Sequence, residues 1–207
     1  MSEIEYFYSA HSAFAYLGSA RLMEIAKAAG RTIRHRPNDL RRVVPASGST
    51  PFSARSKGHY AYFFRREIYR WAEQRNAPVM VGRPTYHDND TTLCNGMLIA
   101  AIVQGHNVDQ LAHVMLESHW RDNSDLADRD TLVELGKRVG LDPIPLLDAA
   151  LSDEVRAIYE ANTQEAIERS VFGSPTYFVD GDMFYGQDRL EMVERALRVP
   201  YAPARSG

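Results

Sequence analysis

The chain of 207 residues has only one cysteine, Cys94, and no long apolar run. A single cysteine excludes an internal disulfide and leaves no pair of thiols for exchange, which excludes a disulfide oxidoreductase. Cys94 lies in the apolar helical stretch LCNGMLIAAI, which favours a small buried side chain over a reactive thiol. If a thiol acts in this protein, it therefore comes from a bound molecule.

Charge and hydropathy indicate neither a nucleic-acid nor a membrane partner. The net charge of -3 and the pI of about 6.2 provide no broad positive field. No apolar run approaches the roughly 20 residues of a membrane helix. The chain passes from Met1-Ser2-Glu3 almost directly into a predicted strand rather than a signal peptide. We expect a cytoplasmic protein that acts on a small molecule.

The first informative segment lies near the N-terminus. A short aromatic and branched strand over 4–8 is followed by a turn at 9–12 and then by a helical pattern. The apolar side of that helix comprises Phe14, Leu17, Leu22, Ile25 and Ala29. Ser12 falls at the N-cap position, beside free backbone amides where the helix dipole favours negative charge. Ser12 is therefore either a plain cap or a cap that also donates to a bound anion.

The second informative segment lies near the C-terminus and predicts a β-hairpin that leads into a helix. The expected elements are a strand over 176–180, a turn at Gly181-Asp182, a strand over 183–185 and a helix over about 188–198. Pro175 opens the hairpin, where its missing amide hydrogen suits the start of a strand. Asp188 and Glu191 form an expected capping pair for the helix.

Between these segments the hydrophobic periodicity is helical for more than a hundred residues. The expected helices include one ending near Arg75, one beginning near Leu93, and others over 111–120, 131–139, 144–151 and 155–168. The segment 45–51, rich in Gly, Ser and Pro, is the clearest linker into this region.

Together the two end segments resemble the thioredoxin fold. More narrowly, they resemble the glutathione-dependent group that contains 2-hydroxychromene-2-carboxylate isomerases and kappa-class glutathione transferases. The matching elements are Tyr6 to Tyr8, Ser12, Tyr16-Leu17, Ile167, Val171-Phe172-Gly173, Pro175-Thr176 and Gly186 to Leu190. The resemblance covers nearly the whole chain. It departs at Ser9 and Ala13, which stand near positions where the family usually has an acidic residue and a proline.

The resemblance implies an α/β protein with a thioredoxin-like fold and a large all-helical insertion. A length of 207 residues with 44% hydrophobic residues suits one such domain carrying an insertion. We expect a discontinuous thioredoxin-like domain over 1–45 and 166–200, a helical insertion domain over 46–165 and a tail over 201–207.

The same resemblance implies glutathione as the cofactor. Its thiolate would accept a hydrogen bond from Ser12 beside the helix amides. Pro175 is cis in the resembled family, which would turn the backbone of Ser174 toward a peptide-like ligand. Gln187 and the helix amides would hold the γ-glutamyl carboxylate, and Asp188 would pair with the ammonium group. Tyr185 and Gly186 would form the adjoining wall.

For the substrate, the resemblance implies an aromatic keto acid. Ser53, Arg55 and Lys57 would hold its carboxylate, with Tyr86 stacking or hydrogen-bonding nearby. His11 adjoins Ser12, and it either points to solvent or helps to deprotonate the cofactor thiol and support a developing anion. No metal site is expected, because the sequence has no HExxH motif or Cys/His cluster.

The activity that best fits these expectations interconverts 2-hydroxychromene-2-carboxylate and trans-o-hydroxybenzylidenepyruvate, or acts on a related intermediate of aromatic-compound degradation. Reversible thiolate addition would turn a double bond into a single bond that rotates. A kappa-like glutathione transferase and a non-catalytic binding protein on a thioredoxin fold stay open as alternatives. The resemblance also implies a homodimer.

Overall fold

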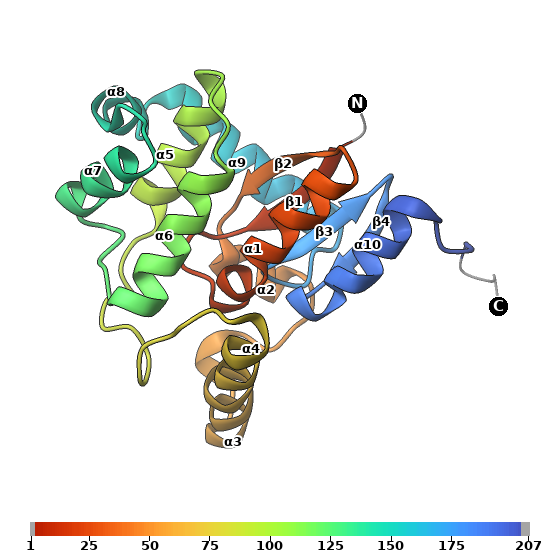
Figure 1. The fold of residues 1–207 in the computed structure, drawn as a ribbon. Coiled ribbons are helices and arrows are strands. Elements are labelled where there is room, and N and C mark those ends of the chain that lie inside the picture. The colour runs from red at the N-terminus through yellow and green to blue at the C-terminus, as the bar shows by residue number, and fades with distance from the viewer. Residues whose placement is uncertain (1–2, 204–207) are drawn as a thin grey trace.

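The computed structural model describes residues 3–203 and contains a four-stranded sheet in the order β2-β1-β3-β4 (Figure 1). The central strand β1 (Glu3–Tyr8) pairs in parallel with β2 (Thr32–Pro37) and antiparallel with β3 (Thr176–Val179), and β3 pairs antiparallel with β4 (Asp182–Tyr185). The N-terminal strand and the C-terminal hairpin are therefore direct neighbours. The expected βα start and ββα finish are confirmed.

The hairpin turn lies one residue earlier than predicted. Val179 pairs with Asp182, so the turn is Asp180-Gly181 and not Gly181-Asp182. Asp180 has a φ of 50° and Gly181 a φ of 93°. A two-residue hairpin turn of type I′ requires positive φ at both central positions, and Asp-Gly meets that requirement well.

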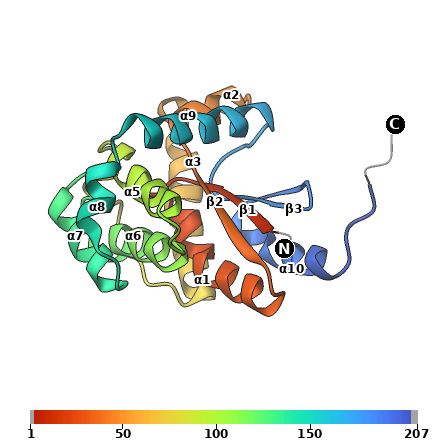
Figure 2. The same cartoon turned by 90° about the horizontal axis from the view of Figure 1, so that it is seen from above.

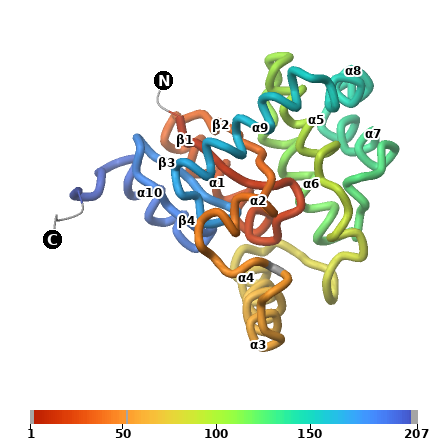
Figure 3. The backbone as a smooth tube through the Cα atoms, turned by 180° about the vertical axis from the view of Figure 1, so that it is seen from behind, coloured from red at the N-terminus to blue at the C-terminus, as the bar shows by residue number. Residues whose placement is uncertain are grey.

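Helices cover both faces of the sheet. Helices α1 (Ala13–Ala28) and α10 (Leu190–Arg198) lie on one side, while α2 (Leu40–Ala46) and α9 (Asp153–Glu168) lie on the other (Figure 2). Seen from behind, α9 crosses in front of the strands (Figure 3). Alternation along β1 explains this arrangement, because successive side chains point to opposite faces of a sheet. The residues packed on the second face are Phe7, Val43, Ala166, Val171 and Phe178.

The remaining helices form a group beside the sheet and a projection below it (Figure 1). They are α3 (Lys57–Ala61), α4 (Ile68–Arg75), α5 (Thr92–Val103), α6 (Asp109–Asp122), α7 (Arg129–Arg138) and α8 (Pro143–Ala149). A 3-10 turn over Phe52–Ala54 precedes α3, and a π-helical segment over Tyr62–Glu67 joins α3 to α4. The expected helices of the central region are confirmed. The linker is shorter than predicted, because α2 continues through Ala46.

One core joins the sheet to the helical group. The cluster that contains Tyr6 and Leu22 also contains Met97 and Leu132, so no break in packing separates the two parts. Helix α9 spans the boundary expected near residue 165. The division into a thioredoxin-like domain and an insertion therefore remains a proposal. Among the residues that the structure describes, no helix is both long and apolar enough to cross a membrane.

The last helix begins differently from the prediction. A 3-10 turn over Gln187–Arg189 precedes α10, and Arg189 occupies the N-cap position without a side-chain cap bond. The expected capping pair of Asp188 and Glu191 is therefore wrong. Glu191 instead accepts a hydrogen bond from Arg75 at 2.8 Å, a partner from a distant helix.

Of the expected tail over 201–207, residues 204–207 lie outside the described part of the chain. Tyr201 packs against Phe184 with ring centroids 6.0 Å apart, and the Arg195 guanidinium lies 3.8 Å from the centre of the Tyr201 ring. The first part of the tail thus contacts the hairpin and α10.

Candidate functional site

Ser12 caps α1, as predicted, and also touches the C-terminal segment. Its Oγ accepts a hydrogen bond from the Ala15 amide at 3.3 Å and donates one to the Ser174 carbonyl, also at 3.3 Å. The Ser174-Pro175 bond is cis, as the resemblance implied. The two motifs found at opposite ends of the sequence therefore meet at one hydroxyl group at the N-terminus of a long helix.

Tyr185 and Gly186 adjoin this contact from the hairpin. The Gly186 amide donates to the Pro175 carbonyl at 2.9 Å. Gly186 has a φ of 100°, and a Cβ there would collide with the Asp188 carboxylate, so only glycine suits the position. The Tyr185 hydroxyl lies over Gly173, where an added Cβ would come within 3.0 Å of it. These residues form the surface that continues outward from Pro175.

Gln187 and Asp188 occupy different environments. Gln187 is buried behind α1, and its Oε1 accepts a hydrogen bond from the Arg75 Nε at 3.2 Å. Asp188 is exposed and forms an ion pair with Arg189 at 3.0 Å. Arg75 was not anticipated from the sequence. The predicted ligand contacts of Gln187 and Asp188 stay predictions, and for Gln187 the side-chain oxygen is already engaged.

The helical group holds the same turn from the other side. Asn95, in the otherwise apolar helix α5, accepts a hydrogen bond from the Ala10 amide at 3.0 Å and donates to the Ser9 Oγ at 3.3 Å. Trp120 donates from its indole nitrogen to the His11 carbonyl at 2.8 Å. Neither residue was predicted to belong to the site. Both fix the backbone that presents Ser12.

His11 is half-buried beside two further histidines. Its ring centroid lies 4.8 Å from that of His87 and 6.4 Å from that of His119. The His87 Nδ1 and the His119 Nε2 are 3.0 Å apart, and the His119 Nδ1 lies 2.9 Å from the Ser124 carbonyl. Burial, aided by the neighbouring charges, lowers the pKa of His11 to about 3 and that of His87 to about 2. The imidazoles of His11 and His87 are therefore neutral at pH 7, and the predicted roles of His11 stay predictions.

The expected substrate residues are only partly brought together. The Arg55 guanidinium lies 5.3 Å from the centre of the Phe64 ring. Burial raises the pKa of Tyr185, and the charge of the Arg55 guanidinium opposes that rise. Ser53, Lys57 and Tyr86 are exposed, and within residues 3–203 no hydrogen bond joins them to the turn at 9–12. Their roles stay predictions.

Cys94 cannot supply a thiolate to this site. Its side chain is fully buried, and its Sγ donates to the Thr91 carbonyl at 3.2 Å. Burial raises the pKa of the thiol to about 12. The prediction of a buried, unreactive cysteine is confirmed.

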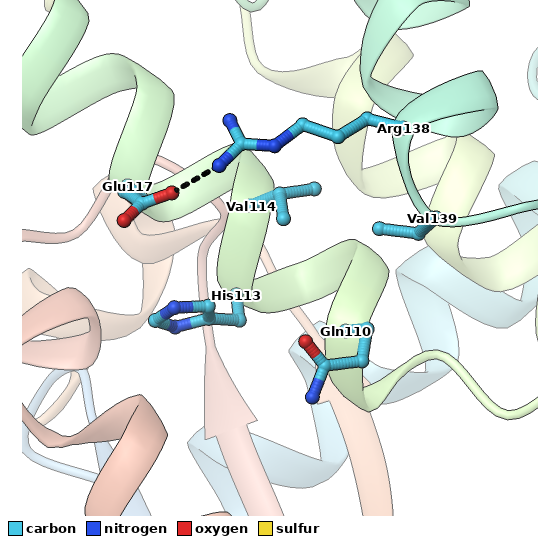
Figure 4. A pocket seen from close by; sticks show the side chains of 6 residues that line it. All are labelled: Gln110, His113, Val114, Glu117, Arg138 and Val139. Atoms are coloured by element: carbon cyan, nitrogen blue, oxygen red, sulfur yellow. Dashed lines mark hydrogen bonds and ion pairs between the residues drawn. The ribbon is translucent and has the colours of Figure 1, made fainter.

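Two surface hollows lie along α6. One of about 480 Å³ is crossed by an ion pair of 2.9 Å between Arg138 and Glu117 (Figure 4). Its lining residues are Gln110, His113, Val114, Glu117, Arg138 and Val139. The other, of about 310 Å³, lies between α1 and the end of α4. None of the residues predicted to bind cofactor or substrate lines either hollow.

Comparison with known proteins places this geometry in a family. Residues 3–198 match the DsbA-like thioredoxin domain. The 2-hydroxychromene-2-carboxylate isomerase of Pseudomonas sp. (strain C18) is 30% identical over 196 residues, which cover 94% of this chain and 89% of that protein. The isomerase of Sphingobium xenophagum is 27% identical over 94% of this chain and 97% of its own length.

A solved structure of a 2-hydroxychromene-2-carboxylate isomerase superposes with a TM-score of 0.78 at 26% identity, covering 94% of each chain. From these matches, the chain belongs to the DsbA-like thioredoxin family and, within it, to the family of the 2-hydroxychromene-2-carboxylate isomerases.

Proposed function

We propose that this protein is a glutathione-dependent isomerase of 2-hydroxychromene-2-carboxylate or a closely related aromatic keto acid. One observation carries the proposal. The hydroxyl of Ser12 stands at the N-terminus of α1 against the Ser174 carbonyl, while the chain's single thiol is buried and held as the neutral form. A sulfur nucleophile at Ser12 must therefore belong to a bound molecule.

The residues around Ser12 fit a bound thiolate. Both hydrogen bonds of the Ser12 hydroxyl are long, at 3.3 Å, so its hydrogen can turn from the Ser174 carbonyl to a sulfur anion with little loss. The free amides and the dipole at the start of α1 favour negative charge at the same place. The DsbM disulfide reductase of Pseudomonas aeruginosa, solved with GSH, shares the fold at a TM-score of 0.65 and 19% identity.

The other end of glutathione would lie toward the start of α10. Asp188 is exposed, so its carboxylate is free to exchange Arg189 for the ligand's ammonium group. The backbone amides of the 3-10 turn over Gln187–Arg189 would face the γ-glutamyl carboxylate. In this proposal the backbone of Ser174 would bind the middle of the tripeptide, and Tyr185 with Gly186 would form the wall beside it.

When bound, glutathione would supply a thiolate that adds to the unsaturated carbon of the substrate and leaves again after rotation about the resulting single bond. The chain would hold that sulfur through Ser12, orient the substrate carboxylate through Arg55, and donate hydrogen bonds to the oxygen on which negative charge develops. Ser53, Lys57 and Tyr86 are the further candidates for contacts with the substrate.

The test is ultraviolet monitoring of 2-hydroxychromene-2-carboxylate with the protein, with and without glutathione. We expect conversion to trans-o-hydroxybenzylidenepyruvate only when glutathione is present, and no glutathione in the product by mass spectrometry. A stable glutathione conjugate would instead identify a transferase. Binding of glutathione without turnover on this or related keto acids would favour a non-catalytic binding protein.

We also propose that the protein works as a homodimer in the cytoplasm. A reaction that consumes no glutathione but needs its reduced form suits a compartment where the glutathione pool stays reduced. Analytical ultracentrifugation at micromolar concentration tests the assembly, and a purely monomeric species would contradict it.

A further inference from the structure

The hydroxyl of Ser9 determines which of the two ring nitrogens of His11 carries the proton. Ser9 is only 1% exposed, and its Oγ lies 3.3 Å from the Asn95 Nδ2 and 2.9 Å from the His11 Nδ1. The orientation of Asn95 is unambiguous, because its Oδ1 accepts from the backbone amide of Ala10. Its Nδ2 is therefore the group that faces Ser9, and it donates to the Ser9 oxygen.

The hydrogen of the Ser9 hydroxyl then has a single destination. In the described part of the chain, the Ser9 Oγ contacts only the Asn95 donor and the His11 ring nitrogen. A buried hydroxyl hydrogen without an acceptor would carry the cost of an unsatisfied polar group. Ser9 therefore donates to the His11 Nδ1, which must be the unprotonated nitrogen. In the neutral ring the proton lies on Nε2.

The Nε2 of His11 is left available. No hydrogen bond to it is formed within residues 3–203, and it is not among the buried side-chain atoms that lack a partner, so it reaches solvent. Its hydrogen is thus a free donor on the residue directly before Ser12. The backbone of His11 is fixed at the same time by the Trp120 indole, which donates to its carbonyl at 2.8 Å.

We propose that His11 acts in the reaction as a neutral hydrogen-bond donor, and not as a base, and that Asn95 is the positioning residue that sets this state through Ser9. The proposal rests on the proposed isomerase function. The acceptor would be the carbonyl oxygen of the bound keto acid, on which negative charge develops when the thiolate adds. The lone pair that a base requires is instead occupied by the Ser9 hydroxyl.

The groups that face His11 keep the ring neutral. His87 and His119 lie beside it, and the guanidinium groups of Arg41 and Arg83 act on it from α2 and from the loop before α5. The Asp88 carboxylate opposes them, and it is paired with Arg83 at 2.7 Å. The Ser12 turn thus contains a donor without positive charge, which does not compete with a cation of the site for the substrate carboxylate.

The direct test is the tautomer of His11, measured by long-range ¹H–¹⁵N correlation on the free protein at pH 7, with assignment from His11→Gln. We expect protonated Nε2 and unprotonated Nδ1. A proton on Nδ1 would overturn the inference whether or not the protein proves to be an isomerase. Absence of isomerase activity, with the expected tautomer, would remove the proposed function and leave the tautomer assignment standing.

The substitution Asn95→Asp should reverse the tautomer of His11. A carboxylate still accepts from the Ala10 amide but cannot donate, so the Ser9 hydroxyl would turn to it and His11 would take its proton on Nδ1. We expect the reversed tautomer and a fall in kcat of about a hundredfold, comparable to the loss of one anion-stabilising donor. Because a buried carboxylate threatens folding, Ser9→Ala serves as the second variant, with both tautomers populated and a smaller loss. An unchanged His11 tautomer in both variants would contradict the role of Asn95.

Kinetics separate a donor from a base. Gln carries an amide hydrogen and cannot act as a base, so His11→Gln should keep kcat within about tenfold, whereas His11→Leu should lose about a hundredfold. Equal loss in both variants would sink the donor role. As a matched control, the exposed His106 replaced by Gln should leave kcat unchanged.

Discussion

Two regions of the molecule hold the turn that presents Ser12, and they hold it in different ways. In the described part of the C-terminal region, Ser174 forms the hydrogen bonds to this turn. Its carbonyl accepts from Ser12 and its hydroxyl accepts from the Ser9 amide, both at 3.3 Å. The helical group uses Asn95 and Trp120, with hydrogen bonds of 3.0 and 2.8 Å to the backbone. The backbone of the turn is therefore held by shorter bonds from the helical group than from Ser174, while the Asn95 bond to the Ser9 hydroxyl is also 3.3 Å long.

This difference separates two tasks. Long hydrogen bonds to a hydroxyl are readily exchanged for a ligand, whereas short bonds from buried side chains to backbone atoms fix a shape. The C-terminal region thus forms a docking edge at Ser174, where a bound peptide would replace the hydrogen bonds to the turn. The helical group resembles a rigid support. Substitutions on the first side should change mainly turnover. Substitutions within the second should change mainly stability, except at Asn95, which also acts on turnover through His11.

The largest effect is expected for Ser12→Ala, which removes the hydroxyl at the docking edge. Turnover should fall by about a hundredfold to a thousandfold, because a donor to the reacting anion is lost. The free energy of unfolding should fall by about 1 kcal/mol through loss of the cap. Steady-state kinetics with glutathione and urea titration measure the two quantities.

Ser152→Ala is the matched control. Ser152 caps α9 by accepting from the Val155 amide at 3.3 Å, the same distance as in the cap formed by Ser12. The control should lose similar stability and keep full turnover. If both variants keep full turnover, Ser12 is only a cap, and the docking edge loses its chemical role.

The rigidity of the helical group is tested next by alanine substitutions at two glycines. A Cβ on Gly96 would collide with the backbone carbonyl of Ala150 at the end of α8, whereas one on Gly18 would meet side chains, the nearest being the Gln187 Cβ at 2.7 Å. The overlap with the Ala150 carbonyl is the deeper one, but the Gln187 Cβ is itself fixed to its backbone, so Gly96→Ala should cost about 3 kcal/mol and Gly18→Ala about 2 kcal/mol. Urea titration checks both. Equal costs would show that the helical group is no more rigid than the packing of α1 on α10.

How much of the site can be predicted from the sequence differs between the two regions, for a physical reason. The strand, turn, cap and helix near Ser12 were predictable, because periodicity and capping act within a few residues. Asn95 gave a visible signal, a lone amide in the apolar stretch LCNGMLIAAI, but its partner Ala10 lies 85 residues away. Glu191 was misjudged as a cap for the same reason, since Arg75 engages it from 116 residues away. The site residues that were missed, His87 and Trp120 among them, are joined to the turn only by tertiary contacts.

The smallest expected effect is the loss of folding stability at acidic pH. Burial lowers the pKa of His11 to about 3 and that of His87 to about 2, against about 6.5 in an unfolded chain. Between those values the unfolded chain binds more protons than the folded one, so stability is fully present above about pH 6.5 and is lost as the pH falls. At pH 5.5 each such histidine should cost about 1 kcal/mol relative to pH 7.5.

Urea titrations at pH 7.5, 6.5 and 5.5 measure this loss, in a range where carboxyl groups remain ionised in both states. His87→Gln removes one of the two histidines, so its stability should fall by about 1 kcal/mol less than that of the native protein across the same range. His106→Gln, at an exposed position, should behave like the native protein. If His87→Gln loses as much stability between pH 7.5 and pH 5.5 as the native protein, protonation of the imidazoles beside Ser12 does not destabilise the fold. The helical group would then be a looser support than its short hydrogen bonds indicate, and the contrast with the docking edge would narrow to Asn95 and Trp120.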